Sequence, residues 1–313
     1  MNKKIIVFVL GLLISAFFIY LSLRNINFPA LFSALFSSSI FLLILAFFLN
    51  LVDICFRSFK WYYILNKKIS FIEAIKSLSL GYSANNLLPA KLGEFVKAYY
   101  LRKQTGIRGS LGAITLERVL EGLTLVIIFG VLLLFFVNNQ WLSTIFITGL
   151  IIFLILFVIL LGLVFKKTLV LKIVSKLKIS FLTESVNKFI AGFDTIKSMS
   201  YLVKITMLSF CVWFFQAITF FVLSRTISLD LSFLVVLLVV CVSNLATVIP
   251  SGPGGIGILE YAVIVLLSFF GISPTLALGY GLLIRFIVVS NSLVIIFSVG
   301  GKQLFKYVRG VSY

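Results

Sequence analysis

The chain has 313 residues, of which 61% are hydrophobic and 12% charged, and its formal net charge is +18. Soluble domains are nearer half apolar and a quarter charged, so this composition excludes an ordinary soluble enzyme. The sequence contains no histidine, which excludes Ser-His triads, histidine-based zinc sites and histidine proton relays. The basic residues lie in short loops between apolar runs, without a nucleic-acid-reading module. We therefore predict a membrane protein facing anionic lipid rather than a nucleic-acid binder.

Apolar runs of roughly 20 residues, the length that crosses a hydrocarbon core about 30 Å thick, recur along the chain. They lack the alternation of β-barrel strands, so each is expected to form a helix. In chain order the runs are Ile5–Leu23, Ile40–Leu65, Phe71–Leu88, Ser110–Val137, Leu142–Phe165, Tyr201–Leu223, Leu231–Ile249, Ile258–Phe270 and Thr275–Val299. We predict an all-α polytopic membrane protein that forms a single transmembrane domain over residues 1–313.

The distribution of basic residues predicts the orientation in the membrane. With the N-terminus inside, all but four of the 27 Lys and Arg fall in cytoplasmic segments. Arg24 and Arg225 then lie outside, while Arg118 and Arg285 lie within the membrane. The basic amphipathic stretch of about residues 166–200 becomes a cytoplasmic loop. We therefore predict a multi-pass protein of the cytoplasmic membrane with both termini in the cytoplasm.

Proline interrupts the apolar pattern twice, at Pro89 and in the segment PSGPGGIG, which contains Pro250 and Pro253. If each broken segment re-enters on the side from which it came, the chain divides into halves of about 1–138 and 139–300. These halves have matching elements and opposite topology. Inverted repeats with discontinuous helices are typical of transporters, and the paired breaks indicate a binding site near the midplane. Residues 231–249 are also compatible with a full crossing.

Two arginines are predicted at membrane depth. Counted from the ends of their apolar runs at 1.5 Å per residue, Arg118 and Arg285 lie roughly 12 and 15 Å deep. A charge there costs about 3 kcal/mol on insertion scales, so it usually has a partner or a task. One interpretation is a structural ion-pair network with Glu117 and Glu121, since Arg118 reaches Glu121 at i+3. The other is a bidentate grip on a lipid phosphate, and both hold if the acids pair with the arginines in the empty site.

The two breaks add backbone donors. Half-helices restarting at Ala90 and Gly255 would present free N–H groups and a positive dipole end, and glycine permits the close approach of an anion. The alternative is a Pro/Gly hinge with a purely structural purpose. No strand precedes the G-x-G-x-x-G of Gly252–Gly257, so it is not a dinucleotide fingerprint. The predicted headgroup-binding residues are Arg118, Arg285, Asn86, Gly93, Gly254, Gly255 and Gly257.

Other polar and aromatic residues receive simpler predictions. Glu94 and Glu260, each just after a break, could cap backbone donors, pair with the arginines or carry a proton. Lys91 and Lys97 could attract headgroups to the inner mouth, but the more ordinary interpretation is that they are solvated interfacial lysines. The isolated cysteines show no metal or redox spacing and are expected to be small core residues, and no metal site is predicted. The residues expected in interfacial aromatic belts are Trp61, Tyr82, Tyr99, Tyr100 and Trp141.

Two stretches carry a resemblance to a known family: NNLLPAKLGEFVKAYYLRKQTGIRGSLGAITLERVLEG and PSGPGGIGILEYAVIVLLSFFGI. Their patterns N-x-x-P-x-x-x-G-E, the Glu-Arg pair and P-G-G-x-G-x-x-E resemble the lysylphosphatidylglycerol synthase transmembrane-region family, a flippase-like domain family, across essentially the whole chain. The resemblance implies a membrane fold that moves anionic or aminoacylated phospholipid, or polyprenyl-linked lipid, between leaflets. Members that synthesise lysylphosphatidylglycerol carry an additional soluble aminoacyl-transferase domain, which we expect this chain to lack. The positions that the resemblance implies are Asn86, Pro89, Gly93, Glu94, Glu117, Arg118, Pro253, Gly254, Gly255, Gly257 and Glu260.

We predict a lipid translocator that binds membrane lipids with phosphate headgroups, without a cofactor and without enzymatic activity. The sequence has no G-x-x-x-x-G-K-[ST] loop, so transport would draw on a gradient or on downhill exchange. One alternative is an intramembrane enzyme acting on a lipid phosphate or polyprenyl carrier, with Glu94, Glu117, Glu121 or Glu260 as base. Another is a scaffold for an envelope glycosyltransferase complex, with an enzyme of lipid or glycan synthesis as partner.

Overall fold

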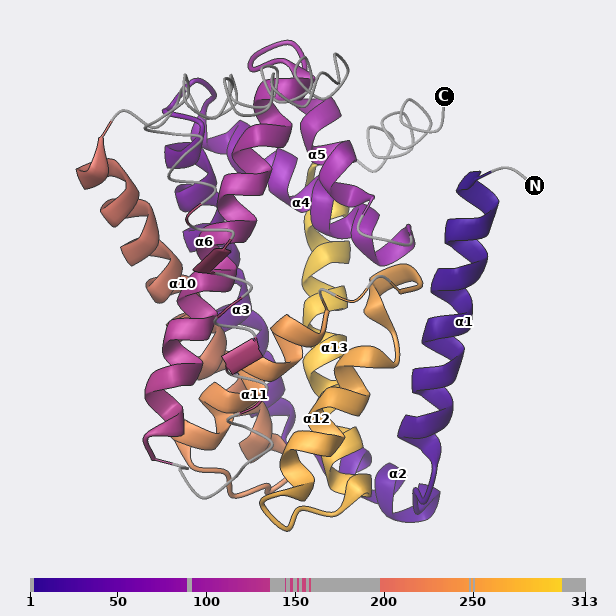
Figure 1. Cartoon of the computed structure of the whole chain (residues 1–313). Helices are drawn as coiled ribbons and strands as arrows, with labels where there is room; N and C mark the ends of the chain where they lie inside the picture. Colours follow the sequence, from indigo (N-terminus) through magenta and orange to yellow (C-terminus); the bar gives the residue numbers. More distant parts are fainter. Residues whose placement is uncertain are drawn as a thin grey trace. The chain divides into compact units, whose positions relative to one another are not determined.

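The computed structural model describes residues 3–88, 92–135, 198–247, 249 and 251–299, and seven further positions between 144 and 158 (Figure 1). The elements of this part of the chain are all helical: α1 (Lys3–Leu23), α2 (Phe28–Phe36), α3 (Ile40–Ile64), α4 (Phe71–Leu87), α5 (Gly93–Tyr100), α6 (Ile107–Leu133), α10 (Met199–Thr226), α11 (Phe233–Ala246), η2 (Pro253–Gly255), α12 (Ile258–Ser268) and α13 (Pro274–Val299). Among the described helices, three (α3, α10 and α13) are long and apolar enough to cross a membrane, and the bent pair α1–α2 is a fourth candidate. The prediction of an all-α polytopic membrane protein is confirmed.

The observed helices differ from the predicted elements in three places. α2 occupies a segment where no helix is expected from the sequence. Asn27 caps it by accepting a hydrogen bond from the Ala30 N–H (3.1 Å), and Pro29 lies in its first turn, where a missing N–H costs nothing. α5 begins at Gly93 rather than at residue 90. α12 begins at Ile258, as the predicted apolar run does, and the half-helix does not restart at Gly255 because η2 precedes it.

Some predicted features lie outside the described residues. They are Pro89, Ala90, Lys91, Pro250, Trp141, most of the run 142–165 and the predicted cytoplasmic loop as far as residue 197.

The helices divide into two compact units. Unit 1 consists of Met1–Ile54, Ser79–Gly93 and Trp213–Val308, and unit 2 consists of Cys55–Leu78, Glu94–Val212 and Arg309–Tyr313. The helices α3, α4 and α10 contribute to both units, and α5 contributes its first residue, Gly93, to unit 1 and the rest to unit 2. Each unit contains one of the two predicted membrane arginines, Arg285 in unit 1 and Arg118 in unit 2.

In unit 1, α12 packs between α11 and α13, and α1 runs along α12 (Figure 1). α1 makes this contact with a narrow stripe of small residues that includes Gly11, Ser15 and Ser22. The Ser15 hydroxyl accepts a hydrogen bond from the Gly252 N–H (3.0 Å), and the Ser22 hydroxyl donates to the Gly257 carbonyl (3.4 Å). The stripe therefore docks α1 directly on the backbone of the second helix break.

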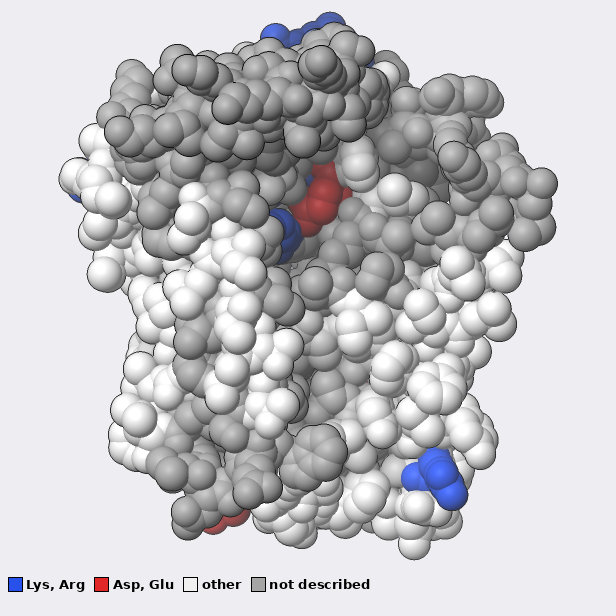
Figure 2. All heavy atoms as spheres, in the orientation of Figure 1, with Lys and Arg blue, Asp and Glu red and all other residues white. Residues whose placement is uncertain are grey.

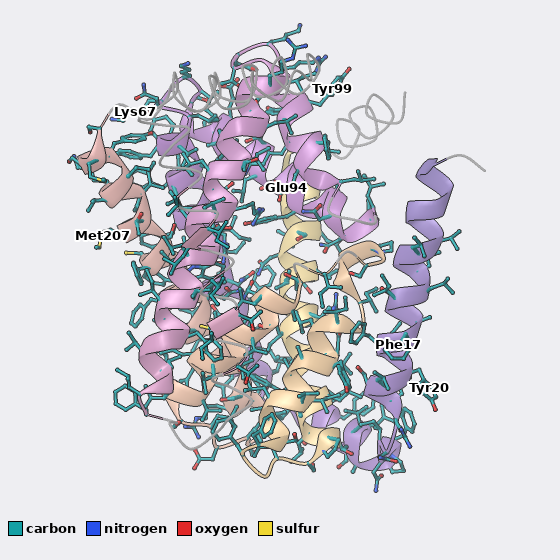
Figure 3. All side chains as sticks on the ribbon, viewed as in Figure 1. Phe17, Tyr20, Lys67, Glu94, Tyr99 and Met207 are labelled. Atoms are coloured by element: carbon teal, nitrogen blue, oxygen red, sulfur yellow. The ribbon has the colours of Figure 1, made fainter. Side chains whose placement is uncertain are left out.

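Away from these contacts, the described helices expose large apolar side chains, as lipid contact requires. Phe17 and Tyr20 on α1 are examples (Figure 3). On the face shown in Figure 2, charged atoms are sparse over the described surface, apart from a recessed group of acidic and basic atoms. Cys55 and Cys211 are also exposed, so the prediction that the cysteines are core residues is correct only for Cys241.

Candidate functional site

The second helix break, in unit 1, is a tight glycine turn. After α11 ends at Ala246, the chain passes through η2 and enters α12 at Ile258. Gly254, Gly255 and Gly257 have φ angles of 66°, 65° and 91°. Side chains make such angles costly, so glycine at these positions is what allows the turn.

Arg285 on α13 holds this turn in place. Its guanidinium donates hydrogen bonds to the carbonyl oxygens of Gly254 (2.7 Å) and Gly255 (3.1 Å). It also pairs with both carboxylate oxygens of Glu260, with Nη2 2.9 Å from Oε2. This is the bidentate geometry of strong arginine–carboxylate pairs.

Glu260 caps the half-helix α12 in addition to pairing with Arg285. Its Oε2 accepts a hydrogen bond from the Gly257 N–H (2.8 Å) and so caps the start of α12. The side chains of Glu260 and Arg285 are 5% and 16% exposed. The Gly257 N–H at the start of the half-helix, which is predicted from the sequence to face a bound anion, is therefore occupied by this carboxylate.

A hollow of about 120 Å³ adjoins the turn within unit 1. Both breaks line it, with Asn85, Asn86 and Leu88 from the first and Thr247, Ile249, Ser251, Gly252, Gly254 and Gly255 from the second. A Cβ atom placed on Gly254 would lie 3.5 Å from Arg285 Nη1 and 3.6 Å from Asn86 Oδ1. Asn86 and the Gly254 backbone therefore line the hollow, and the Arg285 guanidinium lies next to Gly254. The hollow has room for several water molecules, and its amide, hydroxyl and backbone groups suit a small polar group.

The first break is closed by Asn85 and Gly93. The Asn85 Oδ1 accepts a hydrogen bond from the Gly93 N–H (2.8 Å). A Cβ atom at Gly93 would overlap the carbonyl oxygen of Gly81 on α4. Gly93 thus permits α4 and α5 to approach more closely than any side chain would allow, which keeps Asn85 and Asn86 at the hollow.

Unit 2 contains a second charged cluster, centred on Glu121 of α6. Its carboxylate accepts hydrogen bonds from Arg57 Nη1 (3.5 Å), Lys60 Nζ and Arg118 Nη1 (2.8 Å). Arg118 also pairs through Nη2 with Glu94 on α5, which is labelled in Figure 3. The Lys60 side chain is fully buried, whereas that of Arg118 is 38% exposed. Arg118 is thus the most accessible member of this otherwise enclosed set.

Lys97 belongs to the same cluster, so its prediction as a solvated interfacial lysine is wrong. Its Nζ lies 2.7 Å from Glu117 Oε2 and 3.5 Å from the centroid of the Trp61 ring. Trp61 is itself completely buried and donates a hydrogen bond from Nε1 to the Ser77 hydroxyl (3.0 Å), so it does not belong to an interfacial belt. Glu117 also lies 3.9 Å from Lys60 Nζ. A carboxylate and an aromatic face replace the water that an interfacial lysine would have.

The two units repeat one arrangement. In each, a glutamate in the first turn of the half-helix pairs with an arginine on the next long helix. Glu94 pairs with Arg118, 24 residues later, and Glu260 pairs with Arg285, 25 residues later.

The predicted site residues therefore fall into two groups. Unit 1 gathers Asn86, Gly254, Gly255, Gly257, Glu260 and Arg285 at the second break, with Pro253 opening η2. Unit 2 gathers Glu94, Glu117, Arg118 and Glu121. The members of these sites that were not predicted from the sequence are Arg57, Lys60, Lys97, Thr247 and Ser251. The position of Lys60 could have indicated its role, because it lies inside the apolar run Ile40–Leu65, where a charged side chain needs a partner.

Comparison with known proteins agrees with this architecture. Residues 8–295 match the family described as the lysylphosphatidylglycerol synthase TM region. The chain is also 30% identical over 215 residues to the UPF0104 membrane protein MJ1078 of Methanocaldococcus jannaschii, covering 65% of this chain and 86% of that protein. The family match spans both helix breaks and both arginine–glutamate pairs. This chain is therefore a multi-pass membrane protein that belongs to the lysylphosphatidylglycerol synthase transmembrane-region family.

Proposed function

We propose that this protein is a flippase-like translocator that moves a phosphate-bearing lipid headgroup between the leaflets of the cell membrane. The observation that carries the proposal is the hollow in unit 1, which is lined by Asn86 and by the glycine turn whose carbonyl oxygens Arg285 binds. Discontinuous helices at membrane depth are a recurrent way of building transporter binding sites. The description of the family, a lysylphosphatidylglycerol synthase TM region, also supports a role connected with membrane lipids.

In the proposed mechanism, a phosphate oxygen displaces a current ligand of Arg285. The carbonyl oxygens of Gly254 and Gly255 are neutral acceptors, so a charged phosphate replaces them at a gain in charge-assisted hydrogen bonding. Glu260 stays on the other edge of the guanidinium and keeps the arginine compensated while the site is empty. The Asn86 amide and the Ser251 hydroxyl supply neutral donors around the remaining phosphate oxygens.

The hollow accommodates the polar part of a lipid and not the whole molecule. Its volume of about 120 Å³ is below the range of about 300–1,000 Å³ for pockets that enclose a complete small-molecule ligand. The acyl chains would stay in the bilayer while the headgroup crosses. Unit 2 has an accessible arginine of its own, Arg118, which is a second candidate for binding a lipid phosphate.

The orientation and energy source form part of the same proposal. We place both termini in the cytoplasm, because the basic residues follow the positive-inside rule in that orientation. The two halves would be inverted repeats that rock against each other, with an ion gradient or downhill lipid exchange as the driving force.

Reconstitution of the purified chain into vesicles tests the proposal. Vesicles containing acyl-chain-labelled phosphatidylglycerol are treated with a membrane-impermeant quencher, and the lipid is then analysed by mass spectrometry. We expect faster loss of inner-leaflet fluorescence than in protein-free vesicles, with the lipid chemically unchanged. A new lipid species would instead identify an intramembrane enzyme. Neither movement nor conversion of any phosphate-bearing lipid tested would favour a scaffold that acts through a partner enzyme.

A further inference from the structure

The short helix α2 turns sharply away from the helix before it. α1 and α2 are joined by four residues and meet at an angle of 91° (Figure 1). The ends of α2 are fixed to the rest of unit 1: the Asn27 N–H donates to the Thr275 hydroxyl (3.1 Å), and the Ser39 N–H donates to the Thr226 carbonyl (3.1 Å). α2 is therefore a fixed element of unit 1, nearly perpendicular to a helix that belongs to a membrane span.

The anchors of α2 lie where other helices of unit 1 begin or end. Thr275 is in the first turn of α13, and Thr226 is the last residue of α10. Charged residues also lie next to helix ends here. Arg24 follows the end of α1, and Arg225 in the last turn of α10 pairs with the exposed Asp230. Helix ends and exposed charges belong at a membrane–water boundary, so α2 lies at that boundary.

The side chains of α2 separate into distinct faces. Leu31 is buried, and it and Leu35 point at α13, with side-chain carbons 3.3 and 4.0 Å from the position of a Cβ on Gly279. The exposed Ser33 and Ser37 lie on the side of the helix away from these leucines, at four-residue spacing.

A ridge of three phenylalanines flanks the leucine face. Phe28, Phe32 and Phe36, one turn apart, are 46%, 53% and 86% exposed. Phe32 and Phe36 stack with ring centroids 6.3 Å apart. Three such rings facing water would be costly, because each buries 150–250 Å² when covered.

We propose that α2 lies in the plane of the membrane interface and inserts the Phe28–Phe32–Phe36 ridge among the lipid acyl chains, with the serine face toward water. The perpendicular bend, the boundary level and the division into faces are the features of an interfacial amphipathic helix. Large apolar side chains of α1, such as Phe17 and Tyr20, are exposed as well. A bilayer in contact with these side chains would cover the ridge without any additional protein.

This placement also sets the depth of the headgroup site. Pro274 opens α13 beside α2, and Arg285 follows eleven residues later, which is roughly 16 Å along a helix. That distance is about half the thickness of the hydrocarbon core. With α2 in the interface, Arg285 lies near the bilayer midplane.

Site-directed spin labelling of the full chain in vesicles tests the proposal. The background replaces the native cysteines by Cys55→Ser, Cys211→Ser and Cys241→Ala. Phe32→Cys and the adjacent control Ser33→Cys are each labelled, and collision with oxygen, which partitions into lipid, is compared with collision with a water-soluble nickel chelate. We expect the oxygen-to-nickel accessibility ratio to be several-fold higher at position 32 than at position 33.

Two results would overturn the placement. Equal ratios at both positions, with strong nickel access, would place the ridge in water. A label at position 32 shielded from both reagents, with dipolar broadening between labels, would show that a second copy of the chain covers the ridge. Phe36→Cys serves as a second reporter in case labelling at position 32 disturbs folding.

Discussion

Replacing Glu121 by glutamine should destabilise unit 2 strongly. The Glu121 side chain is 5% exposed and accepts from Arg57, Lys60 and Arg118, so Glu121→Gln leaves three clustered cations without their shared carboxylate. Breaking a buried ion pair by removing one partner costs about 3–5 kcal/mol. Glu117, 3.9 Å from Lys60, compensates only part of this charge. We therefore expect the free energy of unfolding to fall by about 3 kcal/mol or more, measured by SDS titration in mixed micelles with circular dichroism.

An exposed pair on the same chain provides the matched control. The Asp230 side chain is 88% exposed in its pair with Arg225, so Asp230→Asn should change stability by no more than about 1 kcal/mol. Adding Lys60→Met to Glu121→Gln should recover part of the loss, because it removes one uncompensated buried cation. If Glu121→Gln costs no more than Asp230→Asn, the cluster is not the buried network that the structure describes.

Two further predictions concern the packing of unit 1. Ser15→Cys with Gly252→Cys should form a disulfide under mild oxidation. A Cβ at Gly252 lies 3.3 Å from the Ser15 Cβ, close to the separation of about 3.5–4.5 Å in disulfides, and the Gly252 φ of −61° suits a side chain. If mass spectrometry finds only free thiols, α1 does not dock as described. Gly257→Ala should lower the free energy of unfolding by about 1–3 kcal/mol, because φ is 91° and the new Cβ would lie 2.8 Å from the Ile19 backbone nitrogen. Gly109→Ala, in open space on α6, should leave stability unchanged or raise it by up to about 1 kcal/mol. Equal losses for the two glycine variants would contradict the observed turn.

The long helices and their breaks could be predicted because the physics that sets them is local. A run of about 20 apolar residues must close its own backbone hydrogen bonds in lipid, and Pro and Gly mark where it fails to continue. α2 was not predicted because its nine residues are too few to form a span of about 20 apolar residues. The restart of α12 was placed too early because Pro253–Gly255 forms a separate turn before Ile258.

The candidate site could be predicted only in part, because its contacts join distant segments. The i+3 spacing predicted that Arg118 reaches Glu121, and the structure has this contact at 2.8 Å. Nothing local indicates that Lys60 meets the same carboxylate from 61 residues away. Lys97 resembles any lysine beside a membrane until the fold places Trp61 and Glu117 around it. Sequence patterns therefore identified the residue types of the site, and tertiary packing determined their partners.

Headgroup movement by arginine variants tests the central claim most directly. Wild type, Arg285→Ala, Arg118→Ala and the control Arg225→Ala, whose arginine belongs to the exposed pair, are reconstituted in identical vesicles at equal protein content. The rate of labelled phosphatidylglycerol movement is then measured for each. We expect the rate for Arg285→Ala to be at least about tenfold below that of wild type, which corresponds to the loss of one charge-assisted hydrogen bond of about 1.5 kcal/mol. The rate for Arg118→Ala should fall by a smaller factor, and the rate for Arg225→Ala should match wild type. Wild-type rates in both Arg285→Ala and Arg118→Ala would show that neither arginine handles the lipid phosphate.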